Sequence, residues 1–76
     1  MATKLEEKKA FKKLCNAFPS DYCTLDLEMI QYSRGEGKVI YKAYAAVDGV
    51  GNHLSDKYKY PIEAVNEVLK HFDREV

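Results

Sequence analysis

Apolar residues recur at helical spacing in the first part of the chain, and charged residues fill most of the positions between them. Thr3, followed three residues later by Glu6, has the sequence of a capping box, and Pro19 disfavours helical geometry in the residue before it. This pattern predicts a helix over residues 4–18. Its apolar stripe consists of Leu5, Phe11, Leu14, Cys15 and Phe18.

The period changes to two at Tyr22, and the alternation continues, with one interruption, to Asp48. The interruption at residues 34–37 contains two glycines, which adopt the positive φ angles of tight turns without steric cost. The pattern predicts two strands joined as a hairpin. The inward residues are Cys23, Leu25, Leu27 and Met29 on the first strand and Val39, Tyr41, Ala43, Ala45 and Val47 on the second.

The register of this hairpin is predicted by requiring both inward sets to face the same core. A loop of residues 35–37 meets this requirement, whereas a loop one residue shorter would place Met29 against Lys42. The predicted pairs are Leu25 with Val47, Leu27 with Ala45 and Met29 with Ala43. On the outward face, Asp26 and Glu28 would lie opposite Ala46 and Tyr44.

A second glycine-containing turn at residues 48–51 predicts a third strand over residues 52–60. With a two-residue turn, Leu54 and Tyr58 point inward beside Val47 and Ala43. Asp56 would also point inward, so it must lie at an open edge or accept a hydrogen bond, and a bulge is the alternative. Pro61 fits the first turn of a last helix over residues 61–74. Its apolar stripe consists of Ile62, Val65, Val68, Leu69 and Phe72.

These elements predict an α+β fold in the order α-β-β-β-α. The chain has 76 residues, about half the usual length of a domain, so we expect one domain over residues 1–76. Neither helix can bury its stripe alone, and the antiparallel sheet has one inward face. Both helices are therefore expected to pack on that face, leaving the other face to solvent.

Composition narrows the classes of partner. Lys plus Arg and Asp plus Glu both number 12, so no net charge draws the chain to nucleic acid or to an anionic membrane. No apolar stretch approaches the roughly 18 residues of a membrane span. Cys15 and Cys23 are too few for a disulfide framework, and no apolar run precedes them. We expect a cytoplasmic protein with two reduced thiols directed to the core.

No residue pattern indicates catalysis, a metal or a cofactor. His53 and His71 have no metal-ligand spacing around them, and Asp26 and Glu28 lie on a solvated strand face where nothing raises a carboxyl pKa. The glycines at residues 49 and 51 precede a strand rather than a helix, unlike those of a phosphate-binding loop. The chain is therefore not expected to be an enzyme, and no catalytic, cofactor-binding or metal-binding residue is predicted.

The outward sheet face is the predicted binding surface, because large aromatics there bury much area at low entropic cost. Its predicted contact residues are Glu28, Ile30, Tyr32, Ile40, Lys42, Tyr44, Lys57 and Lys59. The expected partner is another protein or a second copy of the chain. Exposed tyrosines are also ordinary on strands, and lysines guard an edge strand against aggregation. The alternative function is nucleic-acid binding, with Tyr44 as a stacking platform beside Lys42, Lys57 and Lys59.

Two resemblances bear on function. The order of elements is similar to that of double-stranded RNA-binding domains, although residues 61–64, Pro-Ile-Glu-Ala, lack the lysine cluster with which those domains grip phosphate. The short length, the Gly-rich hairpins and the ending YPIEAVNEVLKHF resemble small phage- or prophage-encoded accessory proteins. That resemblance implies a protein that binds and blocks a host protein, as anti-CRISPR inhibitors do.

Overall fold

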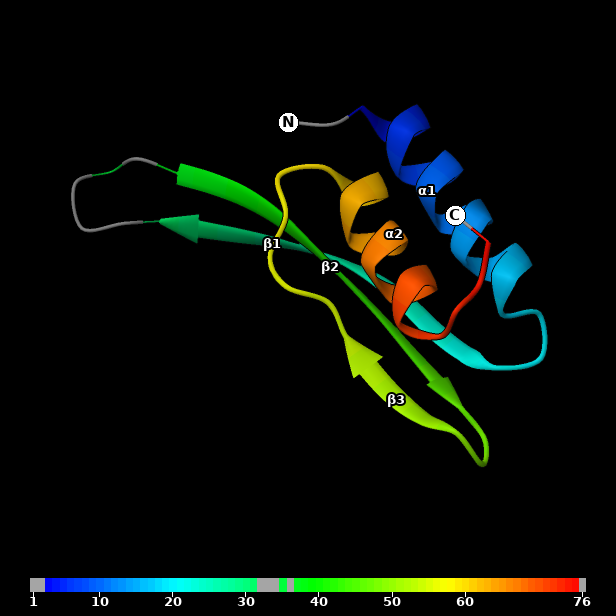
Figure 1. The fold of residues 1–76 in the computed structure, drawn as a ribbon. Helices are drawn as coiled ribbons and strands as arrows, with labels where there is room; N and C mark the ends of the chain where they lie inside the picture. Colours follow the sequence, from blue (N-terminus) through cyan, green and yellow to red (C-terminus); the bar gives the residue numbers. More distant parts are fainter. Residues whose placement is uncertain (1–2, 32–34, 36, 76) are drawn as a thin grey trace.

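The computed structural model describes residues 3–31, 35 and 37–75, and it confirms the predicted order of elements (Figure 1). The three strands form one antiparallel sheet in the order β1-β2-β3. Both helices cover the same face of this sheet, as expected from their apolar stripes. The elements are α1 (Lys4–Ala17), β1 (Tyr22–Gln31), β2 (Gly37–Val47), β3 (Gly51–Leu54) and α2 (Pro61–His71).

The helices begin where the sequence signals place them. Thr3 Oγ1 accepts a hydrogen bond from the Glu6 N–H at 3.1 Å, which satisfies one amide of the first turn of α1. α2 starts at Pro61, whose fixed φ suits the first helical position. The predicted ends at residues 18 and 74 lie beyond the observed ends at Ala17 and His71. In the described part of the chain, neither helix has the length and apolarity needed to cross a membrane.

The core lies between the two helices and the inward face of β2. Its buried members are Ala10, Leu14, Phe18, Tyr41, Ala43, Ala45, Ala64, Val65, Val68 and Leu69. Leu5, Phe11 and Ile62, which the helical stripes place inward, are exposed instead. The small side chains of Ala43 and Ala45 on β2 leave room for the helices to approach, so Ala10 and Ala64 take up buried positions.

The predicted register of the first hairpin is wrong by four residues. Leu25 lies opposite Ala43, Leu27 opposite Tyr41 and Met29 opposite Val39. Gly37 pairs with Gln31 and so belongs to β2 rather than to the predicted loop of residues 35–37, of which residue 36 lies outside the described residues. An even shift leaves every side chain on its predicted face, so the pattern of faces cannot detect it. The end of the hairpin projects past the helices (Figure 1), and Leu27 and Met29 are exposed although they lie on the helix side.

The third strand is shorter than predicted and begins in a different register. Val47 pairs with Gly51 across a three-residue turn, in which Gly49 adopts a φ of +78°. This odd shift reverses the predicted faces, so Leu54 points outward opposite Tyr44 and Ser55 points inward. Asp56 is exposed rather than inward.

A bulge follows β3, and the residues after it lie again on the faces that the sequence predicts. The Ser55 N–H donates to the Ala43 carbonyl at 2.8 Å, whereas Tyr58 exchanges both backbone hydrogen bonds with Tyr41. Three steps along this segment thus match two steps along β2, which is the count of a bulge. Tyr58 consequently returns to the helix side, where the sequence placed it.

Candidate functional site

The face of the sheet opposite the helices carries part of the predicted binding surface. Glu28 and Ile30 of β1 lie on it with Lys42 and Tyr44 of β2, because these residues alternate with those that face the core. Lys57 and Lys59 are exposed in the segment after β3. Tyr32 lies outside the described residues.

The prediction that Ile40 belongs to the binding surface is wrong. Ile40 lies on the outward face but is only 3% exposed, so it offers no contact area. Asp26 and Glu28 also have neighbours other than those predicted, since the shifted register places them opposite Lys42 and Ile40. Glu28 Oε2 lies 3.1 Å from Lys42 Nζ, and both side chains remain partly exposed. This part of the outward face therefore presents a solvated ion pair and does not offer an apolar contact surface.

A compact apolar area forms nearer the β2–β3 turn, from one residue of each strand. The rings of Tyr22 and Tyr44 meet edge to face, with centroids 6.1 Å apart. Leu54 lies directly opposite Tyr44 in the ladder and is 53% exposed, and Tyr22 is 65% exposed. These three residues, here named the tyrosine patch, lie together on the face of the sheet that neither helix covers.

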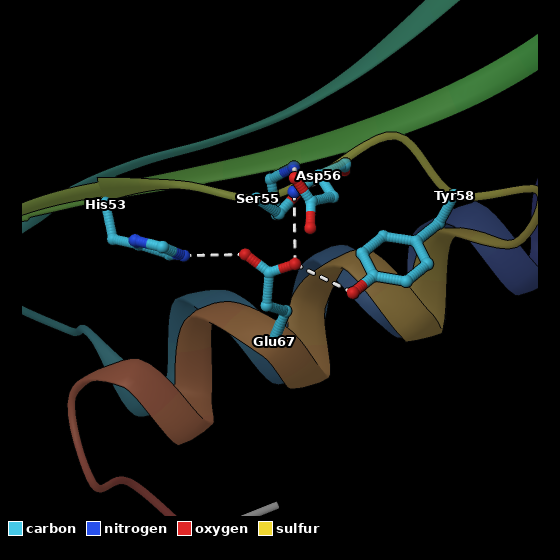
Figure 2. Close-up of polar contacts among 6 residues, drawn as sticks. His53, Ser55, Asp56, Tyr58 and Glu67 are labelled. Atoms are coloured by element: carbon cyan, nitrogen blue, oxygen red, sulfur yellow. Dashed lines mark hydrogen bonds and ion pairs between the residues drawn. The ribbon is translucent and has the colours of Figure 1, made fainter.

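A polar network joins α2 to β3 and the bulge (Figure 2). Both oxygens of Glu67 are engaged: Oε2 lies 2.6 Å from His53 Nε2, and Oε1 accepts from the Tyr58 hydroxyl at 2.7 Å and the Asp56 N–H at 3.1 Å. His71 stacks on His53, with ring centroids 3.9 Å apart. The network therefore fixes the edge of the sheet to α2.

The same contacts alter two acid–base equilibria. Burial alone would raise the pKa of Glu67, but the hydrogen bonds from Tyr58, the Asp56 N–H and His53 outweigh it and lower the pKa below 4.5. The hydrogen bond to Glu67, with a smaller contribution from burial, raises the pKa of Tyr58 to about 12. At neutral pH the pair is therefore a Glu67 carboxylate that accepts a hydrogen bond from a neutral Tyr58 phenol.

This network does not resemble a nucleophilic site, although it contains a serine, a histidine and a carboxylate. The Ser55 hydroxyl donates to the Asp56 carbonyl at 2.8 Å and accepts from the Ala43 N–H at 2.9 Å. The Ser55 hydroxyl thus takes the place of a backbone carbonyl as the acceptor for the Ala43 N–H, and its oxygen is occupied by this hydrogen bond. A nucleophilic serine needs a base within hydrogen-bonding reach of its hydroxyl, but both hydrogen-bond partners of the Ser55 hydroxyl are backbone groups, and the Nε2 of His53 lies against Glu67.

The two cysteines lie at the junction of α1 and β1. Both are free, and both are only half-buried although the sequence predicts thiols directed to the core. Burial, followed by the neighbouring Cys15 thiol, raises the pKa of Cys23 to about 11. Cys23 is therefore a neutral thiol at physiological pH, which makes it a poor nucleophile.

Within the described residues, no group of three or more His, Cys, Asp or Glu side chains could hold a metal ion. Comparison with models of protein families, with curated proteins and with solved structures found no match. The tyrosine patch is consequently the candidate site on the strength of its geometry.

Two of its three residues were not among the predicted contacts. Tyr22 begins β1, and its outward position follows from the same alternation that places Cys23 inward. That signal was present in the sequence. Leu54 carried no such signal, since its face depends on the length of the turn before β3.

Proposed function

We propose that this chain is a non-enzymatic protein-binding module whose contact surface is the tyrosine patch. The observation that carries the proposal is the meeting of Tyr22, Tyr44 and Leu54 on a face that the helices leave open. Aromatic side chains on a sheet lose little conformational freedom on binding, and their hydroxyl groups can pair with a polar rim.

The lysines of the outward face support a protein partner over nucleic acid. Lys42 is paired with Glu28, so its charge is partly neutralised before any ligand arrives. Tyr44 lies between Leu54 and Thr24, neither of which could neutralise a phosphate. Balanced overall charge adds to this argument.

The first experiment is affinity capture with the wild type, Tyr44→Ala and Leu54→Ala, followed by titration of the captured protein. Each substitution should weaken binding by about 1–3 kcal/mol, as truncation of an interface anchor often does, and should leave the fold intact. Ile62→Ala is the matched control, because Ile62 is an equally apolar, exposed residue on α2. Equal losses for all three variants would contradict the assignment of the patch.

A titration with short duplex and single-stranded DNA and RNA tests the alternative. Tight binding that falls steeply as salt rises, and that depends on Lys42 and Lys57, would overturn the proposal. Inhibition of a host protein, which the resemblance to phage accessory proteins implies, stays a prediction about what such binding would do.

A further inference from the structure

β1 is an edge strand of the sheet. The hydrogen bonds of β2 show which residues of β1 direct their backbone groups toward β2 and which direct them to the open edge. The Ala43 N–H donates to Ser55 Oγ, and the Ala43 carbonyl accepts from the Ser55 N–H, so both backbone groups of Ala43 face the β3 side. Bonding direction alternates along an antiparallel strand. Lys42 therefore faces β1, where its partner is Asp26.

The inward residues of β1 consequently direct their backbone groups away from the sheet. Because Asp26 bonds to β2, its neighbours Leu25 and Leu27 project their N–H and C=O groups to the open edge, and Met29 does the same. Among the described residues, no bond between separate segments takes up these groups. β1 thus presents an unpaired row of donors and acceptors along most of its length.

A groove accompanies this edge between α1 and β1. It has a volume of about 410 Å³. Its lining consists of Phe11, Leu25, Leu27 and Tyr41, with Lys4, Glu7 and Lys8 also along α1. Leu27 is 42% exposed and Met29, next on the same face, is 74% exposed. The residues that offer free backbone groups therefore also supply apolar side chains, which is the combination used for strand addition.

A hydrogen bond sets the distance between the two sides of this groove. The Tyr41 hydroxyl donates to Glu7 Oε2 at 2.7 Å, which ties α1 to the centre of the sheet. The groove is therefore formed before any ligand binds, and a ligand need not pay the entropy of ordering it.

The charges of β1 indicate the kind of strand that fits. The outward side chains between the edge residues are acidic: Asp26, which is exposed, and Glu28, which shares its charge with Lys42. An added strand would place alternate side chains on this face, where basic residues are favoured. Its other side chains would enter the apolar groove, so its basic residues would lie on the side away from Lys4 and Lys8.

A second copy of the chain fits this edge poorly. If two β1 strands paired antiparallel with Leu25, Leu27 and Met29 of both chains together, Leu27 would lie opposite its own counterpart. Asp26 would then lie opposite Glu28 of the other copy, twice in each pair of strands. Like charges directly opposite one another destabilise a sheet.

We propose that the open edge of β1 and the groove beside it bind an extended segment of another protein by strand addition, with apolar residues facing the groove and Lys or Arg between them. This surface is separate from the tyrosine patch, and the proposal does not depend on that patch.

The test uses hydrogen exchange measured by NMR on the full chain. The probe is a capped peptide in which Ile alternates with Lys, compared with one in which Ile alternates with Glu. The lysine peptide should slow exchange at the amides of Leu25, Leu27 and Met29 and bind about tenfold tighter than the glutamate peptide. Equal binding of both peptides, or protection elsewhere only, would overturn the proposal. If these amides become protected when the protein concentration rises without peptide, the edge binds a second copy of the chain, and the proposal is overturned.

Leu27→Pro is the sharpest variant, because proline is tolerated on an edge strand where the lost N–H faces solvent. It should remove peptide binding and keep the fold. Phe11→Ala provides a second variant that leaves β1 unchanged and should weaken binding severalfold. Ile62→Ala and Tyr44→Ala should leave peptide affinity unchanged. Loss of affinity in either of these controls would contradict the location of the site.

Discussion

His53 Nε2 lies 2.6 Å from Glu67 Oε2, so one carboxylate of the last helix holds the third strand in place. Its other oxygen accepts from Tyr58 and from the Asp56 amide on the far side of Ser55. Residues 53 and 58 are five apart, and regular alternation would direct them to opposite faces. The bulge between them brings both to the same carboxylate.

Replacing Glu67 by Ala should lower the free energy of unfolding by about 1–2 kcal/mol, because the donors that it satisfies lose their acceptor while partly removed from water. Denaturant unfolding followed by circular dichroism measures this. Lys70→Ala, an exposed change on the same helix, should stay within about 0.5 kcal/mol of the wild type. Equal effects of the two changes would show that Glu67 does not clamp the edge.

Stability should also fall in acid through Glu67. Its pKa is lower in the folded chain than the ordinary value of 4.5, so folding favours the carboxylate. The resulting stabilisation is complete above pH 4.5 and is lost as the pH falls through the folded pKa. The unfolding free energy of the wild type should therefore decline more steeply below pH 4.5 than that of Glu67→Gln. Parallel pH profiles of the two proteins would contradict the lowered pKa.

Two leucines that the sequence places in the core should behave differently. Leu69 is fully buried, so Leu69→Ala should cost about 2–5 kcal/mol, a large share of the stability of so small a fold. Leu27→Ala should cost well under half as much, since Leu27 is exposed to solvent. Thermal melts of both variants measure the contrast. Similar shifts in melting temperature for the two variants would contradict the exposure of Leu27 to solvent.

The Cys23 thiol should react slowly. In Cys15→Ser, where Cys23 is the remaining cysteine, the alkylation rate with iodoacetamide should stay low at pH 8 and rise only toward strongly alkaline pH. Burial is the main cause of the raised pKa and persists in this variant. A rate profile with its midpoint at the ordinary thiol pKa near 9 would be inconsistent with this environment.

The sequence predicts the order of elements and most side-chain faces, because helical and alternating periods are local properties. Thr3, Pro61 and the alternation about Tyr41 all act as expected. Register is less local: a four-residue shift in the first hairpin preserves every face and is invisible to the pattern. A single extra residue in the next turn turned Leu54 outward and so added it to the tyrosine patch. The partnership of Glu67 with His53 joins distant segments and required the tertiary structure.

The bulge after Ser55 also limits how these chains could assemble. A sheet with two open edges can join others into an endless filament. Here β3 is only four residues long, its continuation is bulged, and the Asp56 amide is already bound to Glu67. In the described part of the chain, a long regular edge is therefore available at β1 alone. Addition of a strand at β1 therefore cannot continue into a filament through these edges, because the described part of the chain offers no second edge of this kind on the β3 side.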